Sequence, residues 1–234
     1  MGRAIVRRLA ADGAAVVFTY ATNEAAAKQV VAEVETAGGW ARAVRADLSE
    51  PAQVERLFAA VDQHFARLGI VGLDILVNNA GVPTGTPIAE VTEAEYDRVM
   101  AVNAKSVFFA IQHAIRRLRD GGRIVTLSTM STAYATPGEA VYAASKAAVE
   151  QFTRVATQEL GERGITVNTV SPGPTDTDLL RGAVPEEALQ GVAQMTPLGR
   201  LGRPADIASV VAFLVGLDGG WLTGQNLRAD GGLV

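Results

Sequence analysis

The sequence contains no cysteine and only two histidines among its 234 residues. Without thiols the chain can form neither disulfide bonds nor thiolate metal sites, which favours an intracellular, cytoplasmic protein. The two imidazoles, His64 and His113, lie far apart in amphipathic stretches. We therefore expect them at the surface or at the boundary of the core, and we predict no metal site.

The sequence also lacks a basic excess and a long hydrophobic run. Its formal net charge is -4, whereas a nucleic-acid-binding protein shows a basic balance or a concentrated basic face. The apolar run Ala14–Phe18 is too short to cross a membrane, and Asp12 and Gly13 separate it from the arginines near the start. We therefore expect neither nucleic acid nor a membrane as a partner.

Hydrophobic residues make up 48% of the sequence, in short runs rich in Val, Ile and Leu that alternate with longer amphipathic runs. This alternation predicts strand–helix units around a parallel sheet, an α/β fold in one domain over residues 1–234. The predicted strands are Ala15–Thr19, Ala41–Arg45, Ile75–Asn78, Gly122–Leu127, Thr166–Val170 and Asn226–Arg228.

Local signals refine this layout. Ser49 is predicted to begin a helix with Pro51 in its first turn, and Thr92 with Glu95 forms a capping box before another. The continuous apolar run 75–77 predicts a strand that is buried on both faces by helices on either side of the sheet.

The stretch from Pro172 to Pro204 is the most irregular, because five prolines punctuate it. A long excursion of this kind after a strand often closes over a substrate, so we predict a lid, with an ordered surface insertion as the alternative. Its apolar side chains suit an apolar or acyl substituent: Leu179, Leu180, Met195 and Leu198.

Polar or glycine-rich sequences follow four predicted strands: Asp47-Leu48, residues 78–81, Ser128-Thr129 and residues 171–173. The carboxyl ends of parallel strands meet at one edge of a sheet, where ligands bind, so these segments should converge on one crevice. Small residues at positions 80 and 81 would let a flat ring or a ribose approach the backbone.

Tyr142 and Lys146 are four residues apart in a predicted helix and therefore share one of its faces. A positive charge close to a phenol favours the phenolate and lowers the pKa of the tyrosine, so the pair suits proton transfer. An exposed pair with this spacing is usually only a solvated helix face, and the neighbouring motifs decide between the two interpretations.

In this order and spacing the motifs resemble those of the short-chain dehydrogenase/reductase family in its small single-domain form. The matching segments extend over the whole chain: Gly2-Arg3-Ala4-Ile5, Asp74–Gly81, Val102-Asn103, Tyr142-x-x-x-Lys146, Ile165–Gly173 and Leu222–Gln225. The resemblance implies a Rossmann-type doubly wound parallel sheet and hydride transfer between a nicotinamide cofactor and a carbonyl or secondary alcohol.

The resemblance also implies four catalytic residues. Tyr142 matches the proton donor and acceptor, Lys146 the residue that lowers the tyrosine pKa and binds the nicotinamide ribose, and Asn103 the residue that anchors a water in a proton relay. Thr129 stands thirteen positions before Tyr142, where the family normally has serine. Threonine keeps the hydroxyl but narrows the pocket. Ser128 is the alternative, although strand alternation predicts that it points away.

The implied cofactor contacts begin at the adenosine end and finish at the carboxamide of the nicotinamide. They are Gly2, Tyr20, Asp47, Leu48, Asn79, Ala80, Gly81, Tyr142, Lys146, Pro172, Gly173, Thr175 and Thr177. An acidic residue at the end of the family's second strand would select NAD(H). Because Tyr20 takes that place here, NADP(H) is favoured and NAD(H) is the alternative.

The chain departs from the family at its beginning, where the first strand and most of the glycine-rich phosphate turn are missing and only the tail of that turn, at Gly2, is present. The first strand is central in the order 3-2-1-4-5-6, so we expect a gap between the two halves of the sheet. Either the sequence starts at an internal methionine codon of a longer protein, or a truncated chain binds its cofactor poorly. The intact motifs elsewhere favour the first explanation.

Taken together, the resemblance implies an NAD(P)-dependent oxidoreductase similar to 3-oxoacyl-[acyl-carrier-protein] reductases, and a homo-oligomer, either tetramer or dimer. An acidic carrier protein would need basic residues near the site, and Arg163 and Arg181 are candidates. One alternative is a non-catalytic or cofactor-impaired binding protein on the same fold. Another is an epimerase or dehydratase that uses the same tyrosine.

Overall fold

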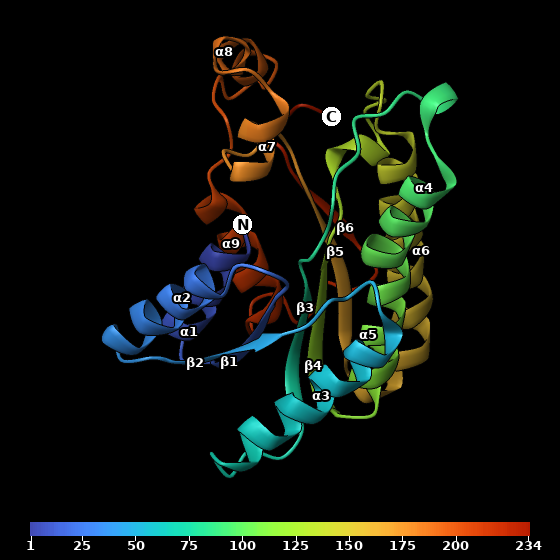
Figure 1. Cartoon of the computed structure of the whole chain (residues 1–234). Helices are drawn as coiled ribbons and strands as arrows, with labels where there is room; N and C mark the ends of the chain where they lie inside the picture. Colours follow the sequence, from blue (N-terminus) through green and yellow to red (C-terminus); the bar gives the residue numbers. More distant parts are fainter.

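The computed structural model describes residues 1–234 and contains six parallel strands with helices packed around them (Figure 1). The strands are β1 (Ala15–Tyr20), β2 (Trp40–Arg45), β3 (Leu73–Asn78), β4 (Leu118–Leu127), β5 (Thr166–Pro172) and β6 (Asn226–Ala229). Every predicted strand is present and is longer than predicted by one to four residues.

The helices follow the same alternating order along the chain. The α-helices are α1 (Gly2–Ala11), α2 (Glu24–Thr36), α3 (Pro51–Ala66), α4 (Glu93–Met100), α5 (Ser106–Ile115), α6 (Ala140–Leu160), α7 (Asp178–Ala183), α8 (Glu186–Gln194) and α9 (Pro204–Val215). Four shorter helical turns are η1 (Ile88–Glu90), η2 (Ala101–Lys105), η3 (Met130–Thr132) and η4 (Gly161–Arg163). None of these helices is both long enough and apolar enough to cross a membrane.

The strands form two separate sheets. One sheet pairs β1 with β2, and the other has the order β3-β4-β5-β6. Both sheets are parallel, with Val17 opposite Arg42 in the first and Val125 opposite Asn168 in the second. Strands β1 and β3, which would flank the family's first strand, are therefore each at the edge of a sheet.

This arrangement corrects the prediction for residues 75–77. They are only partly buried, whereas all seven residues of β5 are buried. The apolar pattern of β3 is that of an interior strand, but β3 has a strand neighbour on one side only.

Helix α1 connects the two sheets through side chains on two adjacent faces. Ile5 and Leu9 pack with residues of β4, β5 and α9, while Val6 and Ala10 pack with α2 and β2. Residues four apart lie one above the other on a helix, so each pair forms its own contact surface. Complete burial of each large aliphatic side chain contributes about 1.5–3 kcal/mol, which makes α1 a substantial link between the sheets.

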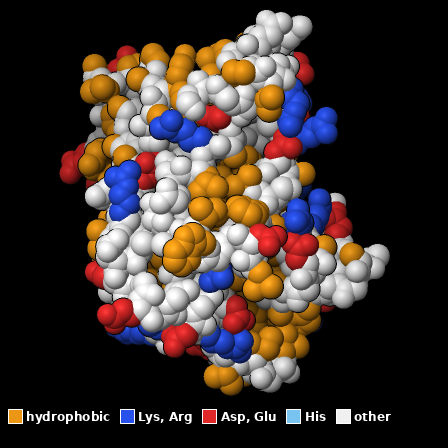
Figure 2. All heavy atoms as spheres, turned by 180° about the vertical axis from the view of Figure 1, so that it is seen from behind, with side chains coloured by type: hydrophobic (Ala, Val, Ile, Leu, Met, Phe, Trp, Pro, Cys, Tyr) orange, Lys and Arg blue, Asp and Glu red, His pale blue; other side chains and the backbone are white.

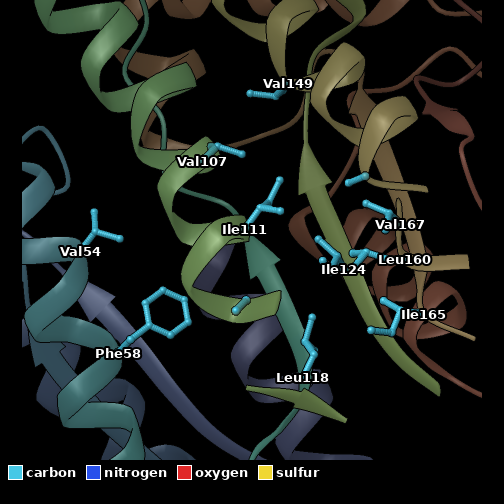
Figure 3. Packing of buried hydrophobic residues seen from close by; sticks show 12 residues of the cluster. Val54, Phe58, Val107, Ile111, Leu118, Ile124, Val149, Leu160, Ile165 and Val167 are labelled. Atoms are coloured by element: carbon cyan, nitrogen blue, oxygen red, sulfur yellow. The ribbon is translucent and has the colours of Figure 1, made fainter. Parts of the chain in front are cut away.

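The other face of the four-stranded sheet carries the largest hydrophobic cluster (Figure 3). Val54 and Phe58 of α3 lie against Ile111 of α5, and this layer packs on Ile124 of β4. The next residue of that strand, Val125, belongs to the cluster beneath α1 and α9. Alternation along β4 thus supplies both faces of the sheet.

The two predicted helix starts agree only in part with the structure. α3 begins at Pro51 with Glu50 as its N-cap, and the Ser49 hydroxyl donates to Asp47 instead. Thr92 does cap α4 by accepting from the Glu95 backbone N–H at 3.2 Å, but the Glu95 carboxylate accepts from the Thr86 hydroxyl. The capping box is therefore half formed.

The irregular stretch 172–204 contains two helices, α7 and α8. Figure 1 shows α7 and α8 projecting from the body of the molecule, away from α3. They connect the buried strand β5 to α9, whose packing against α1 fixes the far end of the excursion.

Candidate active site

The Lys146 side chain is almost completely buried, although it carries a charge. It lies one turn after Tyr142 on α6, is 3% exposed, and donates from Nζ to the backbone oxygen of Leu127 at 2.8 Å. This hydrogen bond brings α6 against the carboxyl end of β4. An ammonium has three donors, and no carboxylate pairs with this one.

Burial perturbs both members of the pair in the direction of their neutral forms. Desolvation lowers the pKa of Lys146 to about 8. Desolvation also raises the pKa of Tyr142, the negative charge of Glu139 raises it further, and a hydrogen bond with Thr129 lowers it. Lys146 is not among the causes of this shift, since its ammonium donates to Leu127, and the expectation that Lys146 lowers the pKa of the tyrosine stays a prediction.

Thr129 follows β4 directly and caps the short turn η3. Its Oγ1 accepts from the backbone N–H of Ser131 at 3.3 Å, contacts the Ser131 hydroxyl at 3.1 Å, and is hydrogen bonded to Tyr142. Ser128 points to a different partner, since its hydroxyl donates to Glu150 at 2.6 Å. The predicted difference in direction between Ser128 and Thr129 is therefore present.

Asn103 is completely buried in the π-helical turn η2 between α4 and α5. Its side chain accepts from the Val82 N–H at 2.8 Å and donates to the Val82 carbonyl at 2.9 Å and the Ser145 hydroxyl at 3.1 Å. These bonds hold the loop after β3 against α6. π-helical turns of this kind occur often at functional sites.

Gly81 follows β3 and faces this cluster. A Cβ at this position would lie 3.2 Å from Lys146 Nζ and 3.5 Å from Asn103 Oδ1, so glycine keeps the space beside the ammonium open. Gly2, at the start of α1, is equally close to the predicted cofactor segment, because a Cβ there would lie 2.8 Å from the amide nitrogen of Asn79. Ala80 lies between Asn79 and Gly81 in the chain, so all three predicted contact residues are consecutive.

The predicted adenosine contacts lie at the ends of β1 and β2. Tyr20 pairs in register with Arg45, whose Nε donates to the Ala21 carbonyl at 3.3 Å. Asp47 is exposed and accepts from the Ser49 backbone and hydroxyl, and Leu48 packs against the main core. Beside these residues lies an open depression of about 650 Å³, lined by Thr22, Asn23, Glu24, Ala25 and Lys28.

The predicted nicotinamide contacts follow β5. Pro172 ends the strand, and Gly173 lies so close to Asp230 that a Cβ would be 2.6 Å from its Cα. The hydroxyl of Thr175 is buried and donates to the Gly173 carbonyl at 2.9 Å, while Thr177 caps α7. Both threonines therefore hold the segment where it leaves the sheet.

The predicted lid presents apolar side chains to the surface, and its Arg181 is paired with carboxylates. Leu179, Met195 and Leu198 are among the exposed large hydrophobic residues. Arg181 bonds Asp176 and Glu186, and Arg163 bonds Asp120 at 2.8 Å. The two arginines considered for carrier-protein docking are therefore engaged within the chain.

Several residues near the site had no motif to identify them. Their positions depend on contacts in the folded structure. They are Arg45 and Lys28 at the adenosine end, and Ser131, Glu139 and Glu150 close to Thr129. The only available signal was the concentration of hydroxyls in the sequence Ser-Thr-Met-Ser-Thr at 128–132. No group of three or more His, Cys, Asp or Glu side chains could hold a metal ion.

These observations fit a nicotinamide dinucleotide. The buried ammonium of Lys146 makes one hydrogen bond and retains two donors, and the absence of a side chain at Gly81 leaves room beside it. A ribose offers hydroxyl acceptors for such donors. Tyr142 and Thr129, whose hydroxyls are hydrogen bonded to each other, can together contact one substrate oxygen.

The known proteins that this chain resembles in sequence and structure are consistent with this geometry. A family model described as enoyl-(acyl carrier protein) reductase matches residues 1–234. The chain is 40% identical to a short-chain dehydrogenase/reductase of Aspergillus aculeatus, over 99% of this chain and 90% of that protein. It is 41% identical to a hydroxynaphthalene reductase-like protein of Metarhizium brunneum, over 100% of this chain and 91% of that protein. The crystal structure of the angucycline C-6 ketoreductase LanV with bound NADP superposes with a TM-score of 0.95 at 42% identity, covering 99% of this chain and 90% of that one.

Proposed function

Because the chain belongs to the short-chain dehydrogenase/reductase family, and is thus an NAD(P)-dependent oxidoreductase acting on a carbonyl or secondary alcohol, we propose that it reduces ketones with NADPH at the Tyr142 site. One observation carries the proposal. The hydroxyl of Tyr142 is hydrogen bonded to that of Thr129, and one turn further along α6 Lys146 carries a buried ammonium with no carboxylate partner.

In this proposal the residues handle the proton while the bound cofactor supplies the hydride to the carbonyl carbon. Tyr142 gives its phenolic proton to the substrate oxygen, which becomes the alcohol hydroxyl, and Thr129 hydrogen-bonds the same oxygen. Burial raises the pKa of Tyr142 and so keeps the phenol protonated at neutral pH, the form that reduction requires. Lys146 then stabilises the phenolate until a proton from solvent restores the phenol, with Asn103 holding the surrounding loops.

The preference for NADPH rests on the adenosine end. No carboxylate directly follows Tyr20, and the nearest one, Glu24, is paired with Lys28 at 2.8 Å. Arg45 lies exposed beside the same strand end. A 2'-phosphate would meet cationic groups there and no unpaired acid within the depression, whereas the 2'-hydroxyl of NADH would gain little from them.

We further propose a fused-ring aromatic ketone as the substrate, with a 3-oxoacyl thioester as the alternative. Two relatives are named for hydroxynaphthalene reduction and angucycline keto-reduction. The flexible apolar side chains of Leu179, Met195 and Leu198 suit a flat apolar face. Arg163 and Arg181, the groups that an acidic carrier would need, already have carboxylate partners.

The test is NADPH consumption with 2-tetralone, acetoacetyl thioester and crotonyl thioester. Ketone turnover is expected, whereas turnover of the crotonyl compound alone would favour the enoyl reduction for which the matching family model is described. Binding of NADPH without consumption across all three would support the non-catalytic alternative, and product formation without net consumption would support an epimerase or dehydratase.

Tyr142→Phe isolates the role of the phenol. General acid catalysis contributes roughly 10²–10⁴-fold, so kcat should fall by at least about 100-fold while the Kd for NADPH changes little. Tyr96→Phe removes the same hydroxyl from an exposed position on α4 and should retain wild-type turnover. Near-normal ketone reduction by Tyr142→Phe would contradict the assignment.

A homo-oligomer is part of the proposal. Phe108 on α5 and Val155 on α6 are about half exposed, and Leu217 and Trp221 after α9 are 95% and 99% exposed. Figure 2 shows hydrophobic side chains gathered in the middle of the rear face, with charged side chains around them. Patches of this kind usually mark association surfaces. Light scattering tests the homo-oligomer, because Trp221→Ser should lower the measured molar mass.

We also retain residues 172–204 as a lid and a cytoplasmic location as proposals. Backbone amides of α7 and α8 should become protected from hydrogen exchange when NADPH and ketone bind together, more than with NADPH alone. Unchanged protection would favour an ordered surface insertion. Cell fractionation checks the compartment.

A further inference from the structure

Glu150 on α6 holds the segment 128–132, which carries Thr129, against the helix. One oxygen of its carboxylate, Oε1, accepts from the Ser128 hydroxyl at 2.6 Å and from the Thr132 hydroxyl at 2.8 Å. We call these two hydrogen bonds the Glu150 tether. Because both bonds end on the same oxygen, a single atom of α6 fixes two points of the segment.

The protons of the tether can be assigned without the Thr129 hydroxyl. Ser128 has one hydroxyl proton, and its other neighbour, the Lys146 carbonyl, is 3.5 Å away, so the proton goes to Glu150. The Thr132 proton has two acceptors, Glu150 at 2.8 Å and the Thr129 carbonyl at 3.0 Å. An ionised carboxylate is the stronger acceptor of the two. The tether is therefore independent of how the Thr129 hydroxyl shares its own proton.

The two tethered residues flank Thr129 along the chain, one position before it and three after it. Ser128 is buried and directs its hydroxyl to Glu150, whereas the Thr129 hydroxyl is hydrogen bonded to Tyr142. Glu150 and Tyr142 are eight residues apart on α6, which is about two helical turns. One rigid helix thus carries the phenol and also fixes the backbone on both sides of the hydroxyl that contacts it.

Two other contacts hold the same region, and neither replaces the tether. Lys146 donates to the carbonyl of Leu127, but in the proposed reaction its ammonium also stabilises the phenolate. Glu139, the N-cap of α6, accepts from the Ser131 hydroxyl at 2.6 Å and so holds one point after Thr129. Glu150 alone binds a residue on each side of Thr129 and has no part in the proposed proton transfer.

We propose that Glu150 is a positioning residue which, through Ser128 and Thr132, holds the Thr129 hydroxyl where it and Tyr142 can bond the same substrate oxygen. Its carboxylate acts on Thr129 only through the neighbouring residues. Without the tether the segment keeps the backbone bonds of its turn η3 but can shift relative to α6. The inference rests on the proposed roles of Tyr142 and Thr129.

The experiment is a double-mutant cycle with 2-tetralone and NADPH. A misplacement of about 1 Å can cost about 100-fold in rate, so Glu150→Ala should lower kcat by about 10- to 100-fold. In the Thr129→Ala background the same substitution should lower kcat by no more than about 2-fold, because the hydroxyl that it positions is gone. A loss of folded protein alone would lower kcat by the same factor in both backgrounds. The Kd for NADPH should change little.

Conservative and control variants separate the acceptor oxygen from the charge. Glu150→Gln keeps an acceptor oxygen for both hydroxyls, so its kcat should stay within about 3-fold of wild type, and a kcat as low as that of Glu150→Ala would contradict the tether. Glu159→Ala removes the same charge from an exposed position on α6 and should keep the wild-type kcat. Ser128→Ala cuts one bond of the tether in a smaller change and should lower kcat only where Thr129 is present.

The cycle distinguishes failure of this inference from failure of the proposed function. Suppose that Tyr142→Phe and Thr129→Ala lose turnover, while Glu150→Ala and Ser128→Ala keep the wild-type kcat or lower it equally in both backgrounds. The inference is then refuted and the proposed function stands. If Tyr142→Phe and Thr129→Ala keep full turnover, the proposed function itself fails and the inference fails with it.

Discussion

Replacing Lys146 by methionine should make the protein more stable while abolishing its activity. The pKa of this lysine is lowered from 10.5 to about 8 because its ammonium is desolvated. At 1.36 kcal/mol for each pH unit, the buried charge costs the folded state about 3 kcal/mol at neutral pH. Methionine fills a similar volume without charge, but it loses the hydrogen bond to Leu127, which contributes about 1 kcal/mol. The expected net gain is about 2 kcal/mol.

For a chain of this length, a gain of this size corresponds to a melting temperature higher by about 4–8 °C. Thermal unfolding without cofactor, followed by circular dichroism at pH 7, measures it. The exposed Lys105→Met is the control and should shift the melting temperature little, because surface substitutions usually stay within about 0.5 kcal/mol.

The pH dependence of the stability difference between wild type and Lys146→Met provides an independent check that the buried charge is destabilising. The folded-state pKa lies below the unfolded one, so the penalty is complete below about pH 8 and disappears as the pH rises from about 8 to 10.5. Wild-type protein should therefore gain stability relative to Lys146→Met over that interval. A variant that is less stable than wild type at pH 7, or a difference that does not change up to pH 10, would refute the argument.

Three further outcomes are expected. Glu139→Gln removes the charge that raises the pKa of Tyr142, so the alkaline loss of reductive kcat should move to lower pH. A pH profile of kcat whose alkaline loss stays at the wild-type pH would contradict this. Arg45→Ala should raise the Kd for NADPH by about 10-fold or more and that for NADH by less than about 2-fold, as charge-assisted phosphate contacts predict, and equal changes would argue against a 2'-phosphate site. Leu9→Ala should lower the free energy of unfolding by about 2–5 kcal/mol in denaturant titrations, as for other buried leucines, and a loss below about 1 kcal/mol would mean that α1 is not a structural link.

The strands could be predicted because they depend on local signals, and the same signals pointed to the segments that form the candidate site. Apolar runs of the right length identified all six strands, and Thr92 correctly marked the start of α4. The polar segments after the strands include Thr129 and Gly81, which the structure places beside Tyr142 and Lys146 respectively. Parallel strands bring such segments together without further information.

Properties that depend on long-range packing could not be predicted in the same way. The run 75–77 has the composition of an interior strand, and only the topology shows that β3 is at an edge. Helical spacing placed Lys146 one turn from Tyr142, but the rise in the pKa of Tyr142 depends on burial and on the charge of Glu139. Glu139, eight residues from Ser131, had no motif that would connect the two.

The link that α1 makes between the two sheets has a consequence for how tightly a ligand can be held. The β1-β2 sheet carries Tyr20 and Arg45, whereas β4 and α6 present Thr129 and Lys146. A dinucleotide that contacts both would act as a bivalent ligand, and its second half would bind at an effective concentration set by the separation of the two bodies. Leu9, which touches no ligand, helps to fix that separation. Avidity for the cofactor is thus partly a property of hydrophobic packing on the side of the sheet opposite α6.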